Sequence, residues 1–165
     1  MTAQPRILLL MGVAGSGKTT IGRQLASELN WPYFEADDFH PAANKEKMGS
    51  GLPLNDDDRA PWLAAIRGRI DDCIRQGQSA VFTCSALKEK YRSTLMDRAP
   101  AVTLVYLAGE PATIEARVRH RASHYMKAEM VQSQFAALEP PAQALTIDIR
   151  EAPEVIVAKI RQALG

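Results

Sequence analysis

Short apolar runs alternate along the chain with segments whose apolar residues recur every three or four positions. The run from Ile7 to Met11 precedes a glycine, which is typical of a strand buried on both faces. From Lys18 to Leu29 the apolar spacing is that of an amphipathic helix. Continued along the chain, the pattern predicts strands at 7–11, 33–35, 80–84, 102–107 and 145–149, and helices at 18–29, 61–76, 88–96, 111–121, 127–138 and 155–164.

Strands separated by helical segments predict an α/β fold of three layers, with a central parallel sheet and helices on both faces. No internal repeat or composition change marks a boundary, so we expect one domain over residues 1–165. The connection from Asp37 to Asp58 is rich in Pro, Gly and Asp, which predicts a loop with one helical turn at residues 43–48. Connections of this length in compact domains are usually functional or disordered, and the specific polar residues of this one favour a functional loop.

Composition and charge exclude several kinds of partner. The 165 residues carry 20 basic and 19 acidic side chains, a net charge of +1, which provides no broad cationic surface for nucleic acid. No apolar run is long enough to cross a membrane. The two cysteines, Cys73 and Cys84, fall in predicted regular elements, and we expect reduced thiols in a cytoplasmic protein. The oligomeric state is open, with a homodimer as the assembly to test.

One segment has the form of a phosphate-binding loop, G-x-x-x-x-G-K-[ST]. It is Gly12-Val13-Ala14-Gly15-Ser16-Gly17-Lys18-Thr19, and it lies between a predicted strand and a predicted helix, as the motif requires. Backbone N–H groups and the positive end of the helix suit phosphate oxygens. We expect Lys18 at the β and γ phosphates of ATP and Thr19 at a magnesium ion. A glycine-rich turn without a ligand is the alternative.

Other features narrow the class of nucleotide-binding protein. The Asn-Lys-x-Asp sequence that reads guanine in GTPases is absent, because Asn44-Lys45 continues with Glu46-Lys47. A motor-type ATPase usually has an acidic residue at the end of a later buried strand, whereas the predicted strand at 80–84 is followed by Ser85. These absences leave a small-molecule phosphotransferase as the favoured class.

Polar residues after the second predicted strand are candidates for the acceptor site, because ligands of parallel sheets bind at the carboxyl ends of strands. Asp37 is predicted to hold magnesium and to accept a proton from the acceptor hydroxyl. The alternative for Asp37 and Asp38 is a solvated turn. For His40, a substrate contact and a hydrogen bond within the loop are equally compatible with the sequence.

The run Asn55-Asp56-Asp57-Asp58 before Pro61 is typical of residues that cap the start of a helix. Arg59 does not fit that role, because a cation at the positive end of a helix is unfavourable unless it holds an anion. Either a substrate carboxylate or one of the carboxylates of Asp56 and Asp57 is that anion.

Arg117 and Arg121 share one face of the predicted helix at 111–121. Basic residues near the end of a helix are favoured by its dipole, so a solvated basic face is the simpler interpretation. In a phosphotransferase the same face would close over the nucleotide as a mobile lid and stabilise transition-state charge.

Taken together, these segments resemble bacterial gluconokinases over nearly the whole chain. Besides the phosphate loop, the resemblance is carried by Ala36-Asp37-Asp38-Phe39-His40-Pro41, Lys47-Met48, Gly51-Leu52-Pro53-Leu54-Asn55-Asp56-Asp57-Asp58-Arg59, Pro61-Trp62 and Cys84-Ser85-Ala86-Leu87-Lys88. It implies a shikimate-kinase-like or nucleotide-kinase-like P-loop kinase fold with a mobile lid. It also implies magnesium- and ATP-dependent phosphorylation of D-gluconate at its terminal hydroxyl, giving 6-phosphogluconate and ADP.

The resemblance implies roles for single residues as well. Lys18, Asp37 and Arg121 would be catalytic, and Thr19 and Asp37 would hold magnesium. The residues implied for ATP are Gly12, Val13, Ala14, Gly15, Ser16, Gly17, Lys18, Thr19, Thr20, Arg117 and Arg121, and those implied for gluconate are Asp37, His40, Arg59, Ser85 and Lys88.

Two residues depart from the pattern of that family. Glu35 stands where aspartate is expected, and its longer side chain is expected to alter the contacts around magnesium, while Ala14 stands where serine is frequent. A shikimate-type or other polyol-acid kinase is the alternative within the kinases. From another class, the alternative is a regulatory protein that binds ATP without transferring phosphate.

Overall fold

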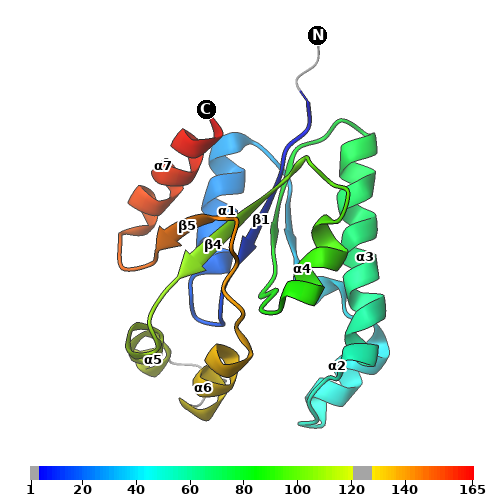
Figure 1. The fold of residues 1–165 in the computed structure, drawn as a ribbon, viewed down its shortest axis with the longest axis vertical. Coiled ribbons are helices and arrows are strands. Elements are labelled where there is room, and N and C mark those ends of the chain that lie inside the picture. Colours follow the sequence, from blue (N-terminus) through cyan, green and yellow to red (C-terminus); the bar gives the residue numbers. More distant parts are fainter. Residues whose placement is uncertain (1–3, 121–127) are drawn as a thin grey trace.

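The computed structural model describes residues 4–120 and 128–165, and a five-stranded sheet forms its centre (Figure 1). The strands are β1 (Ile7–Met11), β2 (Tyr33–Glu35), β3 (Ala80–Thr83), β4 (Val102–Ala108) and β5 (Leu145–Asp148). They lie in the order β2-β3-β1-β4-β5, and every neighbouring pair is parallel. All five carboxyl ends therefore meet at one edge of the sheet. The predicted strands are confirmed to within one residue.

Helices cover both faces of this sheet. Helices α1 (Lys18–Leu29) and α7 (Pro153–Leu164) pack on one face, and α3 (Asp56–Arg75) and α4 (Glu89–Met96) pack on the other. Alternate residues of β1 point to opposite faces of the sheet. Leu8 and Leu10 therefore pack in the apolar core under α1 and α7, and Leu9 packs in the core under α3 and α4. Because both faces are covered, the central strand is apolar throughout. The predicted three-layer α/β fold is confirmed.

The remaining helices lie beyond the carboxyl ends of the strands. Helices α5 (Pro111–His120) and α6 (Ala128–Ala137) lie on one side of this edge, and α2 (Ala42–Gly49) lies on the other (Figure 1). A 3₁₀ helix, η1 (Ala36–Phe39), follows β2 directly. Within the described residues, no helix has the length and apolar character needed to span a membrane.

The start of α3 differs from the prediction, which placed Pro61 in its first turn. The helix begins five residues earlier, because the Asn55 side chain accepts a hydrogen bond from the Asp58 N–H at 2.8 Å and the Asp58 carboxylate accepts one from the Asn55 N–H at 2.9 Å. This capping box satisfies two N–H groups that the helix cannot. Pro61 then lies in the second turn, where it removes the hydrogen bond to the Asp57 carbonyl. The expected capping role of the acidic run is confirmed.

The connection from Asp37 to Asp58 is more helical than the predicted loop. It contains most of η1 and all of α2, which extends the single expected turn in both directions. Asn44, only 4% exposed, donates a hydrogen bond to the Asp58 carbonyl at 2.8 Å. Lys47 forms an ion pair with the Asp58 carboxylate at 2.6 Å. These two bonds fix α2 on the start of α3, and such tertiary contacts are not visible in a local sequence pattern.

Candidate active site

The loop between β1 and α1 is a compact turn whose shape depends on glycine. A Cβ at Gly12 would lie 2.9 Å from the Leu107 carbonyl oxygen, and Gly17 adopts φ of 96°, so a side chain is disfavoured at both positions. The Lys18 Nζ donates to the carbonyl oxygens of Gly12 at 2.9 Å and Val13 at 3.2 Å. Helix α1 begins at Lys18 and directs its positive end at the loop. This geometry suits the binding of phosphate groups.

A cavity of about 510 Å³ connects this loop to the carboxyl ends of β2 and β3. Eight of the predicted site residues line it, among them Lys18, Thr19, Asp37 and Ser85. The other lining residues are Ala14, Gly15, Gly17, Thr20, Glu35, Ala36, Thr83 and Cys84. The structure therefore brings the phosphate loop and the first-choice acceptor residue to the same space.

Oxygen atoms in this cavity fit a magnesium ion. The Thr19 hydroxyl donates to a carboxylate oxygen of Glu35 at 2.8 Å, and Asp37 lines the same cavity. Hydroxyl and carboxylate oxygens are ligands that magnesium prefers, and the ion usually takes only one or two carboxylates together with water and substrate phosphates. Accordingly, no group of three or more His, Cys, Asp or Glu side chains in residues 4–120 and 128–165 is arranged to hold a metal by itself.

Glu35 was not predicted to be a site residue. In the sequence, Glu35 was noted only because aspartate is expected at this position. Its longer side chain was expected to alter the contacts around magnesium. Its hydrogen bond to Thr19 places its carboxylate directly beside the predicted metal ligand. The position of Glu35 at the end of β2, two residues before Asp37, is the signal by which sequence reasoning could have found it.

A second cavity, of about 760 Å³, lies along the phosphate loop, α5 and the start of α7. Arg117 on α5 donates to the Ser16 carbonyl oxygen at 3.5 Å and also to the Ile149 carbonyl oxygen. Thr20 lines this cavity as well as the first one. Arg117 thus lies against the phosphate loop, and its contact with the nucleotide stays a prediction. Arg121 lies outside the described residues, so its role and the movement of a lid stay predictions.

Three described residues predicted for the acceptor, His40, Arg59 and Lys88, lie outside the lining of the 510 Å³ cavity. The His40 ring stacks on Trp62 with 4.3 Å between ring centres, and its Nδ1 is 3.2 Å from the Asn44 amide nitrogen. Burial lowers the pKa of His40 below its usual 6.5, although the nearby Asp37 carboxylate raises it. His40 is therefore neutral at pH 7 and makes the hydrogen bond within its own segment that was one of the two alternatives.

The lowered pKa of His40 predicts a pH dependence of stability. Because the unfolded chain binds this proton more tightly than the folded one, the His40 contribution is fully present above about pH 6.5 and is lost as the pH falls below it. In His40→Phe the ring stack is retained and this titration is absent. We expect the free energy of unfolding of the wild type, minus that of the variant, to be smaller at pH 5.5 than at pH 7.5. Denaturant titrations at both pH values measure it, and an equal difference contradicts the assignment.

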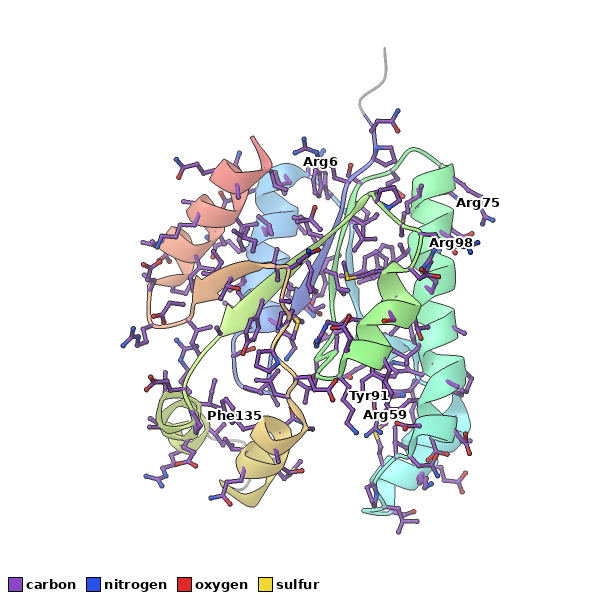
Figure 2. All side chains as sticks on the ribbon, viewed as in Figure 1. Arg6, Arg59, Arg75, Tyr91, Arg98 and Phe135 are labelled. Atoms are coloured by element: carbon purple, nitrogen blue, oxygen red, sulfur yellow. The ribbon has the colours of Figure 1, made fainter. Side chains whose placement is uncertain are left out.

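Arg59 is held by residues of α3 and α4 (Figure 2). It donates to the Tyr91 hydroxyl at 3.1 Å, lies over the Tyr91 ring and is 3.7 Å from the Asp56 carboxylate. The Tyr91 hydroxyl in turn donates to Asp56 at 2.8 Å. Hydrogen bonds from Lys90 and Tyr91 lower the pKa of Asp56, and the charges of Lys90 and Lys88 lower it further. The ion pair with Asp56, one of the sequence alternatives, is therefore present, and Tyr91 is a partner that the sequence did not reveal.

Cys84 lies at the end of β3 in the lining of the 510 Å³ cavity. Its side chain is fully buried, which raises the pKa of the thiol to about 12. Because the thiolate is the nucleophilic form of cysteine, Cys84 is inert at neutral pH. Cys73 and Cys84 are both free and buried, as expected for reduced thiols.

Comparison with known proteins agrees with this geometry. The family model of an AAA domain matches residues 7–141. A probable gluconokinase of Rattus norvegicus is 38% identical over 181 residues, covering 97% of this chain and 98% of that protein. The gluconokinase of Gluconobacter oxydans is 38% identical over 163 residues, covering 97% and 92%.

A solved structure gives the same result. The crystal structure of a gluconokinase from Sinorhizobium meliloti 1021 superposes with a TM-score of 0.82 at 35% identity, covering 98% of this chain and 96% of that one. The similarity thus extends over essentially the whole chain in both sequence and fold, and it confirms the resemblance seen in the motifs. The chain belongs to the gluconokinase family of P-loop kinases.

Proposed function

We propose that the protein transfers the γ-phosphoryl group of ATP to the terminal hydroxyl of D-gluconate, giving 6-phosphogluconate and ADP. The observation that carries this proposal is the single cavity that Lys18 and Thr19 of the phosphate loop share with Asp37 and Ser85. Transfer between two bound molecules requires such a shared space, because the reacting oxygen and phosphorus must be brought into line. Membership in the gluconokinase family supports gluconate as the acceptor.

The residues of the cavity have separate roles in this transfer. The Lys18 ammonium stabilises the negative charge on the transferring phosphoryl group. The Asp37 carboxylate orients the terminal hydroxyl of gluconate and takes its proton as the new O–P bond forms. Arg117, beside the phosphate loop, adds positive charge on the nucleotide side. Arg121 is proposed to do the same from the predicted lid.

Magnesium is proposed to be held by Thr19 and Asp37, with Glu35 beside them. When bound, the ion neutralises charge on the phosphates. Glu35 accepts the hydrogen bond of the Thr19 hydroxyl and so directs its oxygen lone pairs. The side chains of Thr19, Glu35 and Asp37 offer oxygen donors, which suit magnesium better than a softer metal.

Gluconate is a flexible polyol with one anionic end, so its pocket needs several hydrogen-bonding groups and one cation. Ser85 lies in the cavity with Asp37, and we propose that it contacts the hydroxyls of gluconate. Arg59, Lys88 and His40 lie outside its lining and are proposed to reach the far, carboxylate end of the acceptor. The charge of Arg59 contributes to the lowered pKa of His40, which supports a common role of the two residues at that end of the acceptor.

The direct test is an assay of the purified protein with ATP, magnesium and D-gluconate. We expect 6-phosphogluconate and ADP in equal amounts, and no turnover after chelation of magnesium. A panel of sugar acids that includes shikimate distinguishes gluconate from the acceptors of other kinases. Efficient reaction of another acceptor without reaction of gluconate contradicts the substrate, and nucleotide binding without acceptor-dependent ADP release favours the regulatory alternative.

Arg59→Met tests whether Arg59 holds the gluconate carboxylate. A hydrogen-bonded charge contributes about 1.5–3 kcal/mol, so we expect the KM for gluconate to rise about 10- to 150-fold while the KM for ATP is nearly unchanged. Arg75→Met, at the opposite end of the same helix, is the matched control and should leave both constants unchanged. If Arg59 serves only its ion pair with Asp56, the variant loses thermal stability and shows no selective gluconate defect.

Two further proposals concern the setting of the protein. The free thiols of Cys73 and Cys84 suit a reducing compartment, so we propose that the protein acts in the cytoplasm. A homodimer is the assembly we propose to test. Light scattering in solution distinguishes one copy from two.

A further inference from the structure

Helix α6 and the residues that follow it contact the two loops that form the proposed site. At the phosphate loop, the side-chain carbonyl of Gln134 accepts a hydrogen bond from the Ala14 backbone N–H at 3.1 Å. Val131 of the same helix is 1% exposed and belongs to the apolar core under α1 and α7, and Phe135 packs against that core (Figure 2). Helix α6 is therefore fixed to the body of the protein. Gln134 therefore connects an anchored helix to the backbone that surrounds the phosphates.

The chain just after α6 is bonded to the segment at residues 84–88, here called the acceptor loop. The Glu139 N–H donates to the Leu87 carbonyl oxygen at 2.8 Å, and the Glu139 carboxylate accepts from the Glu89 N–H at 2.7 Å. Glu139 is five residues beyond Gln134, so the last turn of α6 and two further residues connect the contacts to the two loops. Ser85, which lines the 510 Å³ cavity, belongs to the acceptor loop.

A buried arginine strengthens this connection. Arg92 of α4 is 3% exposed and donates to the carbonyl oxygens of Ala86 at 2.8 Å, Leu87 at 3.1 Å and Glu139 at 2.7 Å. Ala86 has φ of 45°, a conformation that is unfavourable for residues other than glycine. Strained backbone persists only where its surroundings hold it, and here Arg92 binds its carbonyl directly. Arg92 thus ties the strained acceptor loop to the end of α6.

From these contacts we propose that Gln134, Glu139 and Arg92 are positioning residues that couple the acceptor loop to the phosphate loop through α6. A substrate that binds one loop in the conformation held by these contacts also stabilises that conformation of the other loop, so the second substrate has less conformational freedom to remove. ATP and gluconate consequently bind more tightly together than separately. This inference rests on the proposed function, because it takes gluconate as the ligand of the acceptor loop.

The test is a thermodynamic cycle measured by calorimetry with a non-hydrolysable ATP analogue, magnesium and D-gluconate. The coupling factor is the Kd for gluconate without the analogue divided by the Kd with it. We expect a factor of about 5 or more in the wild type. Loss of one neutral hydrogen bond changes an equilibrium about 2- to 13-fold, so Gln134→Leu should reduce the factor toward one. Gln132→Leu, the same substitution at an exposed position of α6, should retain it.

A second variant probes the other end of the connection without disturbing the buried Arg92. Glu139→Ala removes the carboxylate that accepts from Glu89, and we expect it to reduce the coupling factor as Gln134→Leu does. The double variant should lose little more, because residues that act through one element are not additive. Melting curves confirm that each variant is folded.

Two results overturn the inference and leave the proposed function intact. The first is a wild type that phosphorylates gluconate but has a coupling factor of one. The second is a coupling factor in Gln134→Leu equal to that of Gln132→Leu. A wild type that neither binds nor phosphorylates gluconate overturns the proposed function and this inference together, and it is detected before any variant is made.

Discussion

The Lys18→Met variant is expected to fold normally and to turn over about 10³- to 10⁵-fold more slowly than the wild type, the range associated with a cation on a transferring phosphoryl group. Methionine keeps most of the apolar stem and removes only the ammonium group. The Lys18 Nζ donates to the carbonyls of Gly12 and Val13 in the phosphate loop, so it lies beside the proposed phosphate site, where a fixed cation would stabilise charge in the transition state. The rate of 6-phosphogluconate formation at saturating substrates measures the effect.

The melting temperature of the Lys18→Met variant distinguishes a loss of catalysis from misfolding. The substitution removes two hydrogen bonds of about 1 kcal/mol each, so the melting temperature should fall by less than about 8 °C. A variant that melts like the wild type and retains near-normal kcat shows that the loop at residues 12–19 is not the catalytic nucleotide site.

Asp37→Asn is expected to lower kcat by about 10²- to 10⁴-fold while ATP binding is retained. The amide has nearly the shape of the carboxylate and still suits the 3₁₀ turn, but it does not accept the proton of the gluconate hydroxyl. The measurements are kcat with gluconate and the Kd for ATP by calorimetry.

The neighbouring residue provides the control for this prediction. Asp38 belongs to the same turn, is exposed and lies outside the lining of the 510 Å³ cavity, so Asp38→Asn should have ordinary kinetics. If both variants retain ordinary turnover, Asp37 is a residue of the turn only. If both lose it, the cause is the turn and not the carboxylate of Asp37.

The fold could be predicted from the sequence because the strands and helices at its centre have strong local patterns. β1 is five apolar residues followed by glycine, and α1 combines helical spacing with the phosphate-binding motif at its start. The position of Asp37 at the same cavity as Lys18 also followed from the sequence, since parallel strands bring their carboxyl ends to one edge.

What the sequence did not reveal depends on contacts between residues far apart in the chain. The hydrogen bond from Thr19 to Glu35 joins two elements, and the partnership of Arg59 with Tyr91 joins residues 32 positions apart. Gln134 matches no motif, and its contact with Ala14 exists only because α6 packs beside the phosphate loop. The misplaced start of α3 has a different cause, because a local capping box outweighed the preference of Pro61 for a first turn.

The order of the strands also governs how the chain can fold while it is being synthesised. β1 is synthesised before the other four strands, yet its two neighbours in the sheet begin only at Ala80 and Val102. The most apolar strand must therefore wait, unpaired, for more than half of the chain to be made, and contacts of such long range form slowly. An unpaired apolar strand attracts other chains, so the nascent protein is most prone to aggregate in this interval. This interval ends when β4 has been synthesised, because β1 then pairs with a strand on each side.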